Sequence, residues 1–246
     1  MSVPFLRVPA HALARDPGVP RFADRRAAGR ALAQRLRDLA DVPDLLVLGL
    51  PRGGVPVAYE IARALHAELD VLVVRKLGVP GQPELAMGAI GPGGVAALNE
   101  RVIAEAAVAA SALQQARASE QHELERRERA YRAGLPPLRL RGRTVIVVDD
   151  GLATGATMRA ALAVLRGAGP ARIVVALPVA PPDAAQMLLL DAPDLVVVAQ
   201  PRNFDAVGRF YADFGQTDDD EVRGLLARAR AGAGASRLGT RRAAHP

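Results

Sequence analysis

Aliphatic runs alternate with segments of helical periodicity along most of the chain. The runs are rich in Val, Ile and Leu, which predicts strands buried on both faces, over residues 45–50, 69–74, 144–148, 172–179 and 194–199. Between the runs, apolar residues recur every three or four positions, and we predict helices over 21–40, 55–65, 157–167, 181–190 and 216–230. This alternation is typical of an α/β fold in which helices flank a parallel sheet.

Glycine and proline interrupt this pattern between residues 77 and 98, where we predict a loop with a short hairpin formed by 87–90 and 95–98. Residues 99–132 form a long helical stretch whose second half is highly charged. Such a helix is either a solvated surface element or a mobile lid. We expect 77–133 to be an inserted helical lid.

The two ends of the chain differ from the middle. Residues 1–20 are rich in proline and small residues, which predicts an irregular arm, and residues 231–246 are rich in Gly, Ala and Arg, which predicts a disordered tail. The main domain should therefore extend over 21–215. Within it, 201–215 follows the last predicted strand and is the candidate for a small hood.

Composition narrows the function classes. The chain has no cysteine, which excludes disulfides, thiolate metal sites and cysteine nucleophiles. No apolar run has the length of a bilayer span, and the N-terminus makes a poor signal peptide, so we expect a cytoplasmic protein without a membrane partner. The net charge is +6, but five arginines near the C-terminus account for most of it: Arg228, Arg230, Arg237, Arg241 and Arg242. The remainder is nearly neutral and does not imply a nucleic-acid groove.

One lysine stands among the 32 basic residues, and all the others are arginines. In a chain that uses arginine almost everywhere, Lys76 is either a chance survivor or a position that requires a compact ammonium group.

Residues 145–157 read Val-Ile-Val-Val-Asp-Asp-Gly-Leu-Ala-Thr-Gly-Ala-Thr. A buried strand delivers two acids to the carboxyl edge of the sheet, where open α/β folds bind ligands. The loop that follows leads into a helix whose free amides form an anion site. One ligand could therefore meet both features, with its phosphate at the amides and its diol at the carboxylates. The alternative is a pair of ordinary helix-capping acids.

This segment resembles the signature with which type I phosphoribosyltransferases bind 5-phosphoribosyl-1-diphosphate (PRPP). The resemblance implies the type I phosphoribosyltransferase fold: a parallel sheet flanked by helices, with a small hood. It implies that Asp149 and Asp150 hold the ribose hydroxyls. It also implies that the loop binds PRPP through Gly151 and holds the 5′-phosphate with Ala153, Thr154, Gly155, Ala156 and Thr157.

Two further segments fit the same family in the expected order. The segment Pro51-Arg52-Gly53-Gly54 follows the first strand, where the family has its diphosphate loop; the alternative is an ordinary turn between strand and helix. Arg75 and Lys76 end the second predicted strand, where the family often places a basic residue on the diphosphate. Residues 83–89 also resemble an uncharacterised bacterial subgroup of phosphoribosyltransferase-domain proteins.

The resemblance implies a transferase that moves the 5-phosphoribosyl group from PRPP to a nitrogenous base or related acceptor and releases diphosphate. Arg52 and Lys76 would stabilise the leaving group, with Asp149 and Asp150 completing the catalytic set. We expect Mg²⁺ as the cofactor, bridging diphosphate and diol and touching the two acids directly or through water.

The acceptor must bind elsewhere, because members of the family that act on 6-oxopurines often carry an acid where this chain has Ala153. Candidate residues are Glu84, Phe204, Asp205, Phe210 and Tyr211, and the aromatic ones are either a stacking platform or a hydrophobic plug. A different class remains open, a PRPP-sensing regulator that contacts nucleic acid through its basic tail. An unrelated nucleotide-binding α/β protein is the third interpretation, and a homodimer is the candidate assembly.

Overall fold

The computed structural model describes residues 21–192 and 194–242, so the arm predicted for 1–20 lies outside the described residues. The described chain forms two compact units. The first comprises the described residues up to Val71 together with 143–154 and those from Arg172 onward, and the second comprises 72–142 and 155–171. The second unit is therefore more extensive than the insertion expected at 77–133.

The first unit contains the predicted parallel sheet. Its strands are β1 (Leu46–Gly49), β2 (Glu68–Val71), β6 (Thr144–Val148), β7 (Arg172–Val179) and β8 (Leu195–Ala199). They lie in the order β2-β1-β6-β7-β8, and all neighbours are parallel. The aliphatic side chains of β1 and β6 are almost fully buried, as expected for a sheet covered on both faces.

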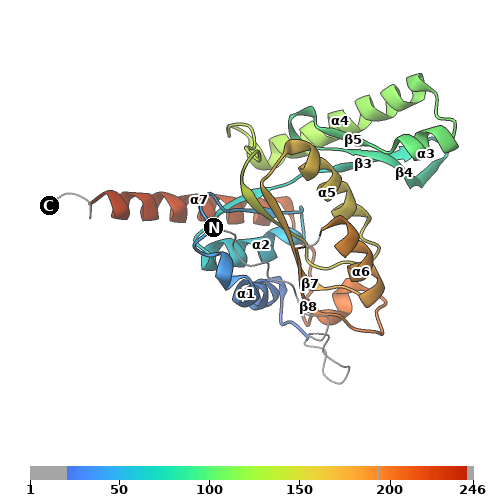
Figure 1. Cartoon of the computed structure of the whole chain (residues 1–246). Helices are drawn as coiled ribbons and strands as arrows, with labels where there is room; N and C mark the ends of the chain where they lie inside the picture. The colour runs from blue at the N-terminus through green and yellow to red at the C-terminus, as the bar shows by residue number, and fades with distance from the viewer. Residues whose placement is uncertain (1–20, 193, 243–246) are drawn as a thin grey trace. The chain divides into compact units, whose positions relative to one another are not determined.

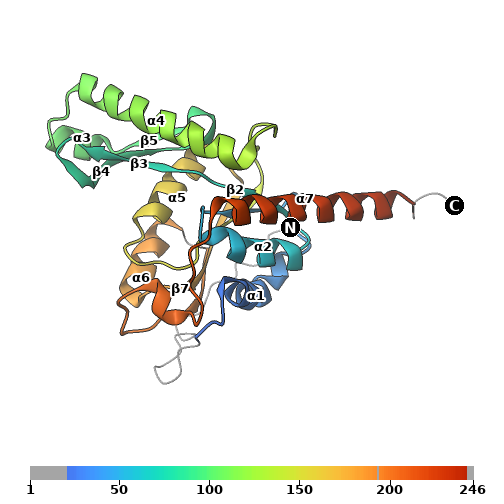
Figure 2. The same ribbon diagram turned by 180° about the vertical axis from the view of Figure 1, so that it is seen from behind.

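Helices of the first unit cover this sheet. They are α1 (Arg25–Arg35), α2 (Gly54–Ala64), α6 (Pro182–Asp191) and α7 (Asp219–Arg242), with short 3₁₀ turns at Arg37–Leu39 and Val207–Phe210. Helices α1 and α2 pack together on one face of the sheet, and α6 lies on the other (Figure 1). Helix α7 lies along α2 and β2 (Figure 2), and its apolar residues Val222, Leu225 and Leu226 are fully buried.

The order of the strands places a topological switch point between β1 and β6. The chain leaves β1 toward β2 on one side and leaves β6 toward β7 on the other. Loops that diverge in this way open a crevice at the carboxyl ends of the two strands, and open α/β sheets bind ligands there. The loops after β1 and β6 carry the segments singled out in the sequence.

The second unit is built on a small antiparallel sheet of β3 (Arg75–Val79), β4 (Gln82–Ile90) and β5 (Ala96–Leu98). Helices α3 (Glu100–Glu105), α4 (Ala110–Arg132) and α5 (Ala156–Ala168) belong to the same unit, with a 3₁₀ turn at Pro92–Gly94. Helix α5 packs on the hairpin through Ala160 and Val164, which contact Ala89. A Cβ on Gly91 would lie 2.3 Å from the Val164 side chain, so this position requires glycine.

The structure differs from the sequence-based expectation in several elements. Residues 77–79 and 82–86, predicted as loop, belong to the antiparallel pair β3 and β4, because the pairing of the two strands outweighs the local glycine and proline signals. Arg75 and Lys76 begin β3 instead of ending β2. The helical stretch 99–132 is broken between α3 and α4, where Ala107 adopts a positive φ of 48° that no glycine or proline signals. Helix α7 continues to Arg242, whereas we predicted its end at residue 230 and a disordered tail from residue 231. The Ala and Arg residues of 231–242 favour helix, although three glycines in the same segment do not; residues 243–246 lie outside the described residues.

No helix among the described residues combines the length and the apolar character that crossing a bilayer would require.

Candidate functional site

Asp149 and Asp150 follow directly on the last residue of β6. The backbone N–H of Leu50 donates to the carbonyl of Val148 at 2.8 Å, which extends the β1–β6 pairing to the point where both loops begin. The Asp149 carboxylate accepts a hydrogen bond from the backbone N–H of Asp150 at 2.9 Å. A Cβ on Gly151 would lie 2.5 Å from the side chain of Val207, so the turn after the acids requires glycine.

The loop after β1 packs directly against these acids. A Cβ on Gly53 would lie 2.1 Å from Oδ2 of Asp150, and a Cβ on Gly54 would lie 2.5 Å from the carbonyl oxygen of Val148. The two glycines therefore permit the close approach of the two loops, which the sequence did not indicate. The peptide bond between Pro51 and Arg52 is cis.

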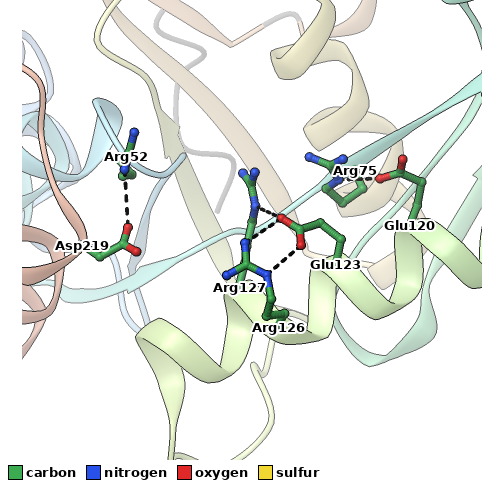
Figure 3. Close-up of polar contacts among 7 residues, drawn as sticks. All are labelled: Arg52, Arg75, Glu120, Glu123, Arg126, Arg127 and Asp219. Carbon is green, nitrogen blue, oxygen red and sulfur yellow. Dashed lines mark hydrogen bonds and ion pairs between the residues drawn. The ribbon is translucent and has the colours of Figure 1, made fainter.

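Arg52 is the exposed cation of this loop. Its guanidinium lies 3.8 Å from the carboxylate of Asp219, the first residue of α7, and both side chains are nearly half exposed (Figure 3). An exposed ion pair of this kind contributes about 0–1 kcal/mol. Arg52 is thus held weakly and can exchange its partner for another anion.

Arg25 is a site residue that sequence reasoning missed. Its Nε donates to Oδ2 of Asp150 at 2.8 Å, and the two side chains are only 12% and 16% exposed. Asp24 caps α1 by accepting from the N–H of Ala27, so the helix begins at Arg25. No local signal marks Arg25, because arginine is common throughout the chain and its partner is 125 residues away.

The segment 210–215 reaches the same acids from the other end of the chain. Phe22 pairs with it as an isolated parallel bridge, with backbone hydrogen bonds to Phe210 and Ala212. The Tyr211 hydroxyl donates to the carbonyl of Asp150 at 2.5 Å. Burial, followed by the negative charge of Asp150, raises the pKa of Tyr211, so the hydroxyl stays protonated and serves as a donor.

The predicted acceptor residues occupy different places. Tyr211 is 1% exposed and its ring packs against Phe22 and Phe214, which is a core position. Phe204 and Phe210 stack on each other with ring centroids 5.4 Å apart. Asp205 is exposed and pairs with Arg209.

The second unit carries the remaining predicted residues. Arg75 pairs with Glu120 of α4 at 2.6 Å (Figure 3), and Lys76 pairs with the exposed Glu84 at 3.2 Å. Gly155 adopts a left-handed conformation with φ of 73° immediately before α5, a conformation that favours glycine. Ala156 and Thr157 are the first residues of that helix, where amides lack intrahelical partners.

The charge state of Asp149 is unusual. Burial, followed by the neighbouring charge of Asp150, raises the pKa of Asp149 to about 8, and Arg25 opposes this shift only in part. An adjacent pair of acids at a strand end therefore holds a proton near neutral pH, as perturbed groups at functional sites often do.

This pKa predicts a pH dependence of stability. Asp149 in the unfolded chain titrates near its usual value of about 4. The raised pKa means that the folded protein favours protonated Asp149. The contribution of this group to the free energy of unfolding is therefore fully present below about pH 4 and is lost as the pH rises through about 8. Asp149→Asn removes the titration, so its melting temperature relative to the original chain should be higher at about pH 9 than at about pH 5. A difference that stays constant across this range contradicts the raised pKa.

An open parallel sheet with paired acids and a Gly/Thr loop at its switch point defines the class of doubly wound α/β proteins, which bind ligands at that place. The phosphoribosyl transferase domain family matches residues 23–208. A protein named "Putative phosphoribosyl transferase Rv0571c" from Mycobacterium tuberculosis is 50% identical over 208 residues, which are 85% of this chain and 47% of that protein. The crystal structure of TT1426 from Thermus thermophilus is 46% identical with a TM-score of 0.78, covering 85% of this chain and 98% of that one.

The chain therefore belongs to the phosphoribosyl transferase family. It spans about half the length of the curated relatives that it matches.

Proposed function

We propose that the chain transfers the 5-phosphoribosyl group from PRPP to a nitrogenous base or related acceptor, with Mg²⁺ as cofactor and diphosphate as the second product. The observation that carries the proposal is the meeting of the two loops. The acids after β6 lie against the glycines of the Pro51–Gly54 loop, at the switch point of the sheet. A sugar and its diphosphate could be held there by neighbouring groups.

Each predicted segment has one task in this proposal. Asp149 and Asp150 accept hydrogen bonds from the ribose hydroxyls. Residues 153–157 bind the 5′-phosphate through the backbone N–H groups of the loop and of the first turn of α5. Ala153 and Thr154 are exposed, as a loop that receives a ligand must be. The Pro51–Gly54 loop of the first unit binds the diphosphate, and the family resemblance assigns Arg75 and Lys76 of the second unit to the same group.

The chemistry needs positioning and charge stabilisation more than a strong catalytic acid. A nitrogen of the acceptor attacks C1 of PRPP while the bond from C1 to the diphosphate oxygen breaks. The diphosphate leaves with the electron pair, the acceptor nitrogen loses a proton, and the ribose ring passes through a state resembling an oxocarbenium ion. Basic side chains at the diphosphate stabilise the charge that develops there.

The donor set of the site suits Mg²⁺. The described residues contain no cluster of three or more acidic or histidine side chains that would hold a metal alone. Mg²⁺ commonly binds through one or two carboxylates together with substrate phosphates, and Asp149 and Asp150 provide such carboxylates, directly or through water. When bound, the ion would neutralise charge on the diphosphate.

The cations assigned to the diphosphate are each paired with a carboxylate within their own unit. Arg52 pairs with Asp219, Arg75 with Glu120 and Lys76 with Glu84. The pairs of Arg52 and Lys76 include strongly exposed groups, so they add little stability. A multiply charged diphosphate would replace Asp219 and Glu84 at small cost.

For the acceptor base, the proposal names candidate contact residues and no specific base. Phe204 and Phe210 form a stacked pair and are only partly buried, so they are the candidates for contacting a flat base. Asp205 lies beside them with its charge engaged by Arg209.

Release of diphosphate tests the proposal. The protein is incubated with Mg²⁺ and PRPP and with a panel of purine, pyrimidine and related nitrogenous acceptors, and diphosphate is measured enzymatically. We expect release that depends on both PRPP and one acceptor class. PRPP binding without turnover across the panel would instead favour a PRPP-sensing regulator, and an absence of PRPP binding would contradict both.

A further inference from the structure

We propose that Arg25 is a positioning residue that orients the Asp150 carboxylate for the ribose of PRPP and ties it to segment 211–215. The inference rests on the proposed binding of PRPP. Arg25 itself would not touch the substrate. It would act through Asp150, and its effect should therefore be confined to ligands that carry a ribose.

Three contacts fix the guanidinium of Arg25. Its Nε donates to Asp150 Oδ2 at 2.8 Å, its Nη1 donates to the carbonyl oxygen of Gly215 at 2.7 Å, and its Cζ lies 3.9 Å from the centroid of the Phe214 ring. A planar fork can donate in two directions while one face rests on an aromatic ring, whereas an ammonium group cannot do all three. These contacts leave the side chain little rotational freedom.

The carboxylate of Asp150 is correspondingly constrained. Its Oδ2 accepts the hydrogen bond from Arg25 and also packs against Gly53, where a Cβ would lie 2.1 Å from this oxygen and 3.3 Å from Nε of Arg25. The Tyr211 hydroxyl holds the backbone carbonyl of the same residue. Because Arg25 engages Oδ2, the proposal assigns Oδ1 of Asp150 to the ribose hydroxyl.

Electrostatics require such a partner. The Asp150 side chain is only 16% exposed, and a buried charge without a partner is costly. Arg25 supplies the compensating charge from a position that is itself 12% exposed. Removing one member of a buried ion pair leaves an uncompensated charge, which is far more costly than losing an exposed pair.

Loss of Arg25 would also admit water. The residue lines a pocket of about 230 Å³ beside the N-terminus of α1, whose wall also includes Asp24, Asp213 and Gly215. A shorter or uncharged side chain would open this pocket toward Asp150. A hydrated carboxylate samples several rotamers, so its preorganisation for a ribose hydroxyl would be lost.

Calorimetric titration with two ligands tests the proposal. Mg²⁺-PRPP carries the ribose, and inorganic Mg²⁺-diphosphate does not. Arg25→Met should lower the affinity for PRPP by about 10- to 100-fold, the range expected for losing a charge-assisted contact. Its affinity for diphosphate should stay within about twofold of the original protein, because diphosphate binds at the Arg52 loop. Arg25→Lys should restore part of the PRPP affinity.

Two controls separate this role from simple stabilisation. Arg30→Met removes an exposed arginine from the same helix and should leave both affinities unchanged. In an Asp150→Asn background, Arg25→Met should cause no further loss of PRPP affinity, because the positioned group is already gone. Circular dichroism shows which variants fold; if Arg25→Met does not, the comparison rests on Arg25→Lys, which keeps the charge.

Four results would contradict either the role of Arg25 or the proposed function. Equal losses of PRPP and diphosphate affinity, or an additive loss in the Asp150→Asn background, would overturn the positioning role. Unchanged PRPP affinity in Arg25→Met would do the same. If Asp150→Asn itself leaves PRPP binding intact, the proposed function fails at its site, and this result is distinct from a failure of Arg25 alone.

Discussion

Replacement of Asp150 by asparagine should weaken Mg²⁺-PRPP binding by about 100-fold or more. An asparagine can turn its oxygen toward Arg25, but it then presents an N–H₂ donor where the ribose hydroxyl needs an acceptor. Turned the other way, it places that donor against the guanidinium, which is only 12% exposed. Either orientation loses one contact, and both lose the negative charge. Isothermal titration calorimetry measures the change directly.

Asp194→Asn is the matched control for this substitution. Asp194 pairs with Arg172 at 2.7 Å, with side chains 15% and 27% exposed, so the pair resembles that of Asp150 and Arg25 in geometry and burial. It lies at the starts of β7 and β8, the opposite edge of the sheet from the proposed site. We expect Asp194→Asn to lower stability without changing PRPP affinity. Equal PRPP affinities in the two variants would show that the acids after β6 do not bind the ribose.

Replacement of Gly54 by alanine should disrupt the same site through the backbone. Alanine is the better helix former by about 1 kcal/mol, which would favour the variant at an open helical position. At Gly54, however, the new Cβ would lie 2.5 Å from the carbonyl oxygen of Val148 and 3.0 Å from Cα of Asp149. Both are backbone atoms of the central strand and its loop, so neither can rotate away.

Overpacking of this kind costs about 1–3 kcal/mol and outweighs the helix propensity. We therefore expect the free energy of unfolding of Gly54→Ala to fall by about 1–3 kcal/mol and PRPP affinity to fall by at least about tenfold, because the two loops must separate. Urea denaturation and calorimetry measure the two effects. Gly224→Ala is the control, since a Cβ there has no neighbour within 4 Å, and it should be neutral or slightly stabilising. A stable Gly54→Ala that binds PRPP normally would contradict the close approach of the loops.

Structural features that depend on residues close together in the sequence could be predicted from the sequence alone. The five aliphatic runs became the five parallel strands, because Val- and Ile-rich segments between helices are stable only when both faces are covered. The acids after β6 and the glycines after β1 are also visible in the sequence, because each group directly follows an aliphatic run. Their place at strand ends follows from local pattern, and the ends of adjacent parallel strands share one edge.

Strand β3 illustrates a limit of local pattern. The sequence predicts one strand over residues 69–74 that ends in Arg75 and Lys76. In the structure β2 ends at Val71, and β3 begins at Arg75 in the antiparallel sheet of the second unit. The pairing with β4 decides this boundary, through contacts such as Arg75 with Ile90 and Lys76 with Ala89. Both sheets accept the same residue types, so only the partner strand distinguishes them.

The sequence by itself determined the α/β class, the order of the strands along the chain and the loop that carries Asp149 and Asp150, because each depends on residues close together in the chain. Only the tertiary structure decided that Arg25 pairs with Asp150, that Tyr211 is buried with its hydroxyl on the Asp150 carbonyl, and that Arg52 faces Asp219. Those contacts join residues separated by long stretches of chain. In a protein that uses arginine almost everywhere, no local feature distinguishes the arginine that a distant carboxylate will engage.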